Sequence, residues 1–485
     1  MDVWLIAVSA FGVALGIVFG AIPGLNQGVL MVLTLPLTFY MNSLVAQVLL
    51  IGMYVGGVAG SMVTGVMIGI PGSPASVMTT FDGHAMAKRG QGARALALGV
   101  TASFVGGLIS WLVLATASVP LARFAITFSG FEMAALVFGG LLMIASASGG
   151  NMTKGLIAGA LGVLVSLVGL DPITTDPRFT FGYEKLEAGL GIFPVLLGIF
   201  AIGGLVSDIQ QPRQADAVAT PGFVQIVRAA GSTLRYWQNL IRSSLIGTWI
   251  GILPGIGANI GAVISYTVAR SVSKDPDSFG KGAEEGIVAA EAGNNATVGG
   301  ALVPMITLGI PGSAADVILM AALIFHNIQP GPLMMVEHEA TFFGIIATYF
   351  VATVLMFVIL VASCRYLGRI TEIPRHILAP LIFVVAIIGT YSINGQLFDI
   401  WIMLIFGVAG VLMKWSNIPT APFVIGFILA PLFEANMRSA LMTSDGSFAP
   451  FFTRPVSLGI LIFAVLFVVW PMITGAIRRR SGTAG

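Results

Sequence analysis

Long apolar runs separated by short polar stretches recur along the whole of this 485-residue chain. Five of them, at residues 3–20, 96–119, 190–209, 340–364 and 456–474, are almost free of charged side chains. A helix needs about 20 such residues to cross the hydrocarbon core of a bilayer. The pattern predicts an all-α integral membrane protein, with about 12 transmembrane helices once shorter and broken or re-entrant runs are counted.

The composition indicates the same class. Hydrophobic residues make up 56% of the chain and charged residues 9%, whereas a soluble domain carries about 25% charged residues. A soluble protein with buried helices is therefore disfavoured. The single cysteine, Cys364, excludes an internal disulfide framework and a multi-cysteine metal site. The first apolar run follows Met1-Asp2 with no basic segment, so we interpret it as a retained helix rather than a signal peptide.

Two sequence patterns occur twice, in the same order. The pattern G-x-x-x-G-x-x-P-G occupies residues 16–24 and returns 231 residues later. The letters GIPGSPASV at 69–77 return 240 residues later as GIPGSAADV. Chance recurrence of glycine and proline in apolar sequence is the alternative, but two matches at similar offsets favour an internal repeat. We therefore divide the chain into a first transmembrane repeat (1–206), a central cytoplasmic loop (207–242), a second transmembrane repeat (243–477) and a cytoplasmic tail (478–485).

The placement of Lys and Arg predicts the orientation of the repeats, because short loops rich in these residues lie on the cytoplasmic side. The first nine-letter motif is followed by three such residues within 88–94, but the second is followed by Glu-His-Glu at 337–339. We expect these two stretches on opposite sides, which makes the repeats inverted and the C-terminus cytoplasmic. A count of membrane passes also gives the two repeats opposite orientations if the short runs 29–41 and 256–270 are counted as passes.

Four Pro-Gly pairs interrupt apolar runs, at 23–24, 71–72, 254–255 and 311–312. Proline removes an amide donor, and glycine allows a turn and a close approach of ligand to the backbone. Irregular backbone persists in lipid only inside protein or beside a watery cavity, and paired breaks in two inverted halves indicate the central site of a secondary transporter. Kinks and glycine packing are the alternative for any single motif.

Small polar side chains follow the breaks and can cap the next helix or bind a ligand there, and capping alone would explain each of them. The first 87 residues contain no Lys or Arg, so we expect an anion to be held by amides, hydroxyls and a co-bound cation, with Na⁺ at the same breaks. The predicted substrate-binding residues are Asn26, Ser73, Ser76, Thr79, Asn259, Ser313 and Asp316. The predicted ion-binding residues are Gly24, Gly72, Gly255, Glu291, Asn294, Asn295 and Gly312.

Ionisable groups near these segments are few. An acid at the centre of a bilayer is costly and usually faces the protein interior. Glu291, among small residues, fits contact with a cation or substrate as well as a buried structural network. Asp82 and His84 we interpret as part of a turn at the membrane surface rather than a proton relay.

No enzyme motif is present. The chain lacks the nucleotide-binding pattern G-x-x-x-x-G-K-[ST]. His338-Glu339 is followed by Phe342 where a zinc protease helix needs its second histidine. We therefore expect no enzymatic activity, no nucleic-acid partner and no cofactor, apart from Na⁺ or H⁺ as a coupling ion.

The stretches at 20–41, 69–96, 279–317 and 326–334 resemble the large membrane subunit of the tripartite tricarboxylate transporters. The resemblance extends over nearly the whole chain. It implies a multi-pass protein of the bacterial inner membrane that works with a small four-helix membrane subunit and a periplasmic solute-binding protein. One departure is Asn26-Gln27-Gly28, where a more glycine-rich sequence is expected.

These observations and the resemblance together predict an importer of di- and tricarboxylate-type organic anions, coupled to Na⁺ or H⁺, that works by alternating access. The alternative is a channel-like or receptor membrane subunit that performs no uphill transport. Uphill uptake under an imposed ion gradient distinguishes the two.

Overall fold

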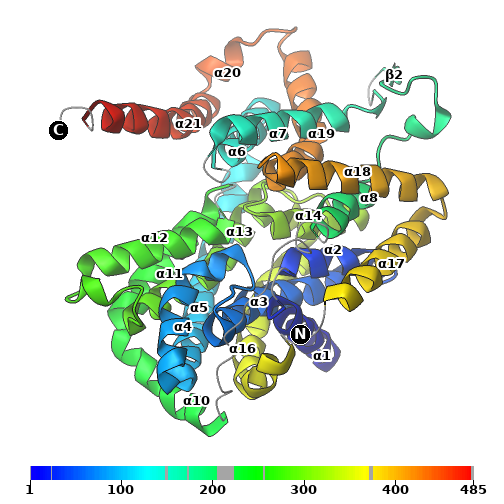
Figure 1. Ribbon diagram of the computed structural model, residues 1–485. Helices are drawn as coiled ribbons and strands as arrows, with labels where there is room; N and C mark the ends of the chain where they lie inside the picture. Colours follow the sequence, from blue (N-terminus) through cyan, green and yellow to red (C-terminus); the bar gives the residue numbers. More distant parts are fainter. Residues whose placement is uncertain are drawn as a thin grey trace. The chain divides into compact units, whose positions relative to one another are not determined.

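The computed structural model describes residues 2–22, 25–147, 151–171, 174–204, 223–254, 257–370 and 375–481. These ranges are mostly helical (Figure 1), which confirms the predicted all-α class. Within the described residues, the only strands are two residues long: β1 (Gly169–Leu170) pairs antiparallel with β2 (Pro177–Arg178).

Six helical segments in the described ranges are long and apolar enough to cross a membrane. The predicted run 3–20 coincides with one of them, and the stretch 88–94, expected as a loop, contains a break at Gly90 (φ 77°) between two helical stretches. The total of about 12 spans stays a prediction. The six segments are Val3–Gly20, Ser43–Ile68, Pro74–Ile126, Glu339–Cys364, Leu397–Trp415 and Thr420–Thr443.

Packing divides the chain into two compact units, each built from two separate stretches. Unit 1 comprises Met1–Ala122 and Ile192–Leu412, and unit 2 comprises Arg123–Gly191 and Met413–Gly485. The helices of unit 1, or beginning in it, are α1 (Val3–Gly20), α2 (Gln27–Thr38), α3 (Ser43–Ile68), η1 (Pro74–Ser76), α4 (Val77–Met86), η2 (Ala87–Gln91), α5 (Gly92–Ile126), α8 (Ile192–Leu196), η4 (Leu197–Ile202), α10 (Phe223–Ala230), η5 (Gly231–Tyr236), α11 (Trp237–Ile252), α12 (Gly257–Val272), η6 (Pro276–Ser278), α13 (Glu284–Leu308), α14 (Ala314–Phe325), α15 (Met334–Glu337), α16 (Glu339–Ile370), α17 (Arg375–Asn394) and α18 (Leu397–Trp415). Those of unit 2 are α6 (Gly130–Ala147), α7 (Met152–Ser166), η3 (Glu184–Leu186), α19 (Thr420–Thr443), α20 (Ala449–Thr453) and α21 (Pro455–Ser481).

In unit 1, helices α1 and α3 pack with their backbones in contact. A Cβ atom on Gly16 would collide with the carbonyl oxygen of Met53, and one on Gly20 would collide with that of Gly57. Membrane helices approach this closely where small residues line the interface. The packing holds the end of α1 against the middle of α3.

The same contacts recur between α11 and α13, which Figure 1 shows as neighbouring green helices. Gly247 lies against the carbonyl oxygen of Gly293, and Gly251 lies against that of Thr297. Each residue stands 231 or 240 positions after its counterpart in α1 or α3. The two halves of unit 1 thus share packing contacts as well as sequence patterns. Their opposite orientation stays a prediction.

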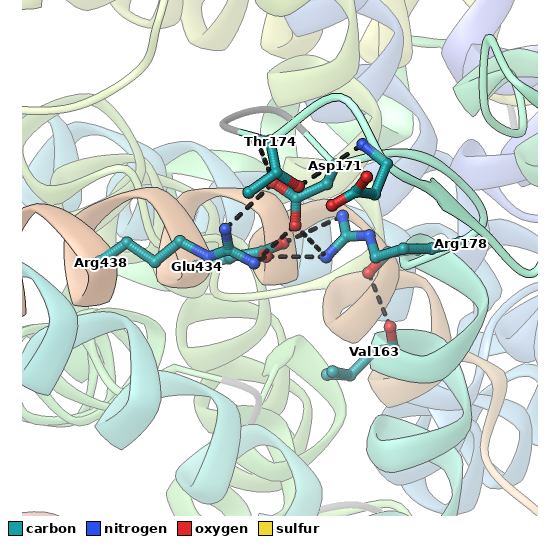
Figure 2. A network of polar contacts seen from close by, with 8 residues as sticks. Val163, Asp171, Thr174, Arg178, Glu434 and Arg438 are labelled. Carbon is teal, nitrogen blue, oxygen red and sulfur yellow. Dashed lines mark hydrogen bonds and ion pairs between the residues drawn. The ribbon is translucent and has the colours of Figure 1, made fainter.

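In unit 2, helix α19 packs against α6 and α7, and a charged network joins it to the loop after α7. Figure 2 shows Arg438 donating to both carboxylate oxygens of Asp171, at 3.0 and 2.7 Å. Arg178 donates to Glu434 at 2.8 Å, and the Thr174 amide donates to Asp171 at 3.0 Å. The arginines and acids offset one another and fix the loop to α19.

Candidate functional site

The two nine-letter motifs form matching helix breaks. Gly69 follows the last residue of α3 and Gly309 follows the last residue of α13, with φ of 71° and 72°. This left-handed backbone favours glycine, and the proline two residues later lacks the amide needed to continue a helix. Ser73 and Ser313 then stand directly before η1 and α14.

Glycine at the breaks is required by packing. A Cβ atom on Gly72 would collide with the carbonyl oxygen of Gly20, at the end of α1. One on Gly312 would crowd the carbonyl oxygen of Gly251, at the equivalent point of α11. In each half, the second break therefore contacts the end of the helix that precedes the first Pro-Gly pair. Gly72 and Gly312 were predicted to bind an ion, and their packing already requires glycine.

The polar residues of the first break make local caps. The Ser76 hydroxyl donates to the carbonyl oxygen of Ser73 at 2.9 Å and accepts from the Ser73 amide at 3.4 Å. The Ser73 hydroxyl donates to Ser61 at 3.0 Å, and all three serines are buried. Asn26 is exposed and caps α2 by accepting from the Val29 amide at 3.1 Å. Each of these predicted residues has a partner within the protein.

A buried carboxyl group joins the two halves of unit 1. Thr79 of α4 donates to Glu291 of α13 at 2.5 Å, and Ser103 of α5 donates to the other carboxyl oxygen at 3.1 Å. Asn295 donates to Ser103 at 2.8 Å and to Glu291 at 3.3 Å. All four side chains are buried. Three predicted residues thus lie together, with only neutral donors around the acid in this part of the structure.

A second polar group surrounds the start of α14. The hydroxyl groups of Tyr54 and Ser313 lie 3.0 Å apart, and the Ser313 hydroxyl accepts from the Asp316 amide at 3.4 Å. The amides of Gly312 and Ser313 lie near the Asp316 carboxylate. However, neither carboxylate oxygen has a hydrogen bond of regular geometry from any described residue.

Other buried polar atoms near these helices also lack regular partners among the described residues. The carboxamide of Asn294 lies near Glu291 without a regular hydrogen bond. Gln47 of α3 donates to the carbonyl oxygen of Leu319 at 3.4 Å, but its own side-chain oxygen accepts from no described residue. The predicted residues that lie outside the described set are Gly24, Gly255 and the side chain of Asn259.

Neither Ser103 nor Tyr54 was predicted from the sequence as a site residue. Tyr54 stands 240 positions before Asn294, so the repeat offset could have drawn attention to it. No comparable signal connects Ser103 to Glu291, which lies 188 positions later. Their proximity is a property of the folded chain.

The predicted surface turn at Asp82 is wrong. Asp82 lies within helix α4 and is buried. One carboxylate oxygen accepts from the amides of Gly280, Gly282 and Ala283, each at 2.8 Å, and the other accepts from the Tyr266 hydroxyl at 2.8 Å. These four donors satisfy the carboxylate, so Asp82 holds the segment before α13 against α4.

The described residues contain no group of three or more His, Cys, Asp or Glu side chains that could hold a metal ion. The two polar groups are instead built from hydroxyls, carboxamides and single carboxyl groups. Such oxygen-rich surroundings suit small anions and alkali cations better than transition metals.

Comparison with known proteins gives a family and two relatives. The family model described as the tripartite tricarboxylate transporter TctA family matches residues 6–425. An uncharacterized 52.8 kDa protein in the TAR-I ttuC' 3' region of Agrobacterium vitis is 32% identical over 470 residues, covering 97% of this chain and 93% of that protein. A protein in the TAR-II ttuC' 3' region of the same organism is 34% identical over 235 residues, covering 48% of this chain and 97% of that protein. These matches confirm the family resemblance: the chain is a multi-pass membrane protein of the tripartite tricarboxylate transporter TctA family.

Proposed function

We propose that this chain carries a small organic anion of the di- or tricarboxylate class across the bacterial inner membrane, coupled to entry of Na⁺ or H⁺. The observation that carries the proposal is the pair of polar groups buried behind matching helix breaks in unit 1. A buried polar atom without a partner costs about 1–3 kcal/mol. Unpartnered atoms of Asn294 and Asp316 at this place are therefore expected where a ligand completes the site.

The charge pattern supports an anion held without an arginine clamp. The chain has no Lys or Arg in its first 87 residues and none between Lys281 and Arg365. The amides at the starts of α4 and α14 carry the positive ends of helix dipoles and suit a carboxylate. A co-bound cation would lower the cost of bringing that carboxylate into a low-dielectric interior. Binding of the two ions would then be reciprocally coupled.

Alternating access would use the two halves of unit 1 as moving parts. Two of the contacts that link the halves involve the break segments: Thr79 with Glu291, and Tyr54 with Ser313. Each contact joins a break segment of one half to the long helix of the other half. Both hydrogen bonds would therefore rearrange when the binding site changes from facing one side of the membrane to facing the other. We propose that a small four-helix membrane subunit and a periplasmic solute-binding protein complete the assembly.

The decisive experiment is reconstitution of the chain in liposomes with the proposed small membrane subunit and solute-binding protein. We expect [¹⁴C]citrate, or another carboxylate bound by the solute-binding protein, to accumulate above its external concentration under an inward Na⁺ or H⁺ gradient. Uptake that only equilibrates the substrate would favour the channel-like alternative. Ligand binding without any uptake would favour a receptor.

The inverted arrangement has its own test. Gln91 and Glu337 are exposed and follow the first and second nine-letter motifs. With Cys364→Ser as the background, Gln91→Cys should react with an impermeant maleimide only from the cytoplasmic side. Glu337→Cys should react only from the periplasmic side. Reaction of both from the same side would rule out the inversion.

A further inference from the structure

Asp316 is a buried acid with no cation beside it among the described residues. Its side chain is 0% exposed, and neither carboxylate oxygen has a regular hydrogen bond from a described residue. None of the ion pairs within the described ranges involves it. A carboxylate buried without a partner is strongly disfavoured, so this side chain is stable only with a proton or a bound cation.

The neighbouring helices supply no such charge. Helices α2, α3, α8 and α13 pack against α14, and none of them contains Lys, Arg or His. The ionisable groups that they contribute are the acids of α13 and the phenol of Tyr54. The balancing charge therefore has to come from outside these helices.

The first half shows that capping does not need this acid. Ser76 stands 240 positions before Asp316, at the third residue after the capping serine. Its hydroxyl is neutral, and it donates to the Ser73 carbonyl and accepts from the Ser73 amide. A hydroxyl is thus sufficient to start a helix at this break, so capping does not explain why the second break has an acid at Asp316.

We infer that the start of α14 binds Na⁺, with the Asp316 carboxylate and the hydroxyl oxygens of Ser313 and Tyr54 as ligands. Hard cations prefer oxygen ligands, and the two hydroxyls already lie 3.0 Å apart beside the acid. The inference rests on the proposed function and identifies its coupling ion. It also reassigns Asp316 and Ser313 from the predicted substrate site to the ion site, because an unbalanced carboxylate repels an anionic substrate.

The test is a titration of the purified full-length chain in lipid nanodiscs, with unfolding followed by tryptophan fluorescence. At constant ionic strength, NaCl replaces choline chloride or KCl. Because a ligand that binds only the folded state stabilises it, we expect Na⁺ alone to raise the Tm by a few degrees. Asp316→Asn should remove this response, and its Tm without Na⁺ should equal or exceed that of the parent.

The matched control is Asp399→Asn, which removes a buried acid of α18 that accepts from Asn394 at 2.8 Å. This variant should keep the Na⁺ response. Ser313→Ala and Tyr54→Phe should fold and bind Na⁺ about tenfold more weakly, as losses around a bound metal ion typically do. These two variants test the site even if Asp316→Asn fails to fold.

Three outcomes would overturn the inference: a full Na⁺ response in Asp316→Asn, an equal response to K⁺ and choline, or stabilisation by acid alone with no added effect of Na⁺. The last outcome would assign a proton to Asp316. The assay measures binding without transport, so Na⁺ binding together with failed accumulation in liposomes would refute the transport proposal and leave the site standing.

Discussion

The break at 69–77 and the break at 309–317 share a backbone and differ in chemistry. Both follow a left-handed glycine, and both place a serine before the next helix. In the first, Ser76 is satisfied by its neighbour Ser73, whereas in the second Asp316 is a buried acid without a regular partner. Glycine packing keeps the backbone of the repeats alike, while their side chains are free to bind different ligands.

The contacts between the halves differ as well. The first break reaches a carboxyl group, through Thr79 and Glu291, and the second joins two hydroxyl groups, Tyr54 and Ser313. A hydrogen bond to an ionised group is about twice as strong as one between neutral groups. We therefore expect these two contacts, Thr79 with Glu291 and Tyr54 with Ser313, to contribute unequally to stability.

The largest effect is expected where the two breaks are alike. Gly72→Leu and Gly312→Leu each force a side chain against backbone at the end of α1 or α11, and backbone cannot move aside as a flexible side chain can. We expect each to lose at least about 3 kcal/mol of unfolding free energy and to yield little monodisperse protein in size-exclusion chromatography. Gly459→Ala is the control, because no heavy atom lies within 4 Å of its added Cβ. Normal behaviour of Gly72→Leu alone would show that the shared packing is not required.

The next largest effect comes from giving the first break the acid of the second. Ser76→Asp places a carboxylate where the substrate anion is proposed to bind. Two like charges about 6 Å apart repel by about 3 kcal/mol at an effective dielectric constant of about 20, so substrate affinity should fall about 100-fold. Ser76→Ala is the control for loss of the cap. Unchanged affinity for radiolabelled substrate would place the anion elsewhere.

A smaller effect compares the two links between the halves. Thr79→Val removes the donor to Glu291 and should lower the free energy of unfolding by about 1–3 kcal/mol. Tyr54→Phe removes one of two hydroxyls and should cost less, about 1 kcal/mol, in Na⁺-free buffer. Unfolding in mixed micelles with increasing SDS measures both. A larger cost for Tyr54→Phe would reverse the expected order.

The smallest effect separates a cap from a ligand. Ser73→Ala removes the hydroxyl that donates to Ser61 and should lower stability by about 1 kcal/mol, and it should leave the Na⁺ dependence of uptake unchanged. Ser313→Ala should cost a similar amount and also raise the Na⁺ concentration needed for half-maximal uptake. Identical Na⁺ curves for the two variants would make both serines caps only.

The sequence was sufficient to predict the class of fold and the positions of the breaks. Apolar runs and Pro-Gly pairs are local signals, and α1 coincides with the predicted run 3–20. The partners of the buried acids could not be predicted from the sequence, because residues such as Thr79 and Glu291 stand 212 positions apart. The surface turn predicted at Asp82 was wrong for the same reason. The backbone amides that donate to its carboxylate stand about 200 residues away in the chain, and no residue near Asp82 in sequence indicates them.

The charged network of unit 2 has a consequence for how the chain is made. Asp171 and Arg438 are separated by 267 positions, and unit 2 consists of two stretches with most of unit 1 between them in sequence. During synthesis, α6 and α7 leave the ribosome long before α19 has been made. Until then, Asp171 and Arg178 lack their partners Arg438 and Glu434. Insertion of the last helices is therefore the step that completes unit 2. A chain that stalls before residue 434 therefore lacks the residues of α19 that pair with Asp171 and Arg178.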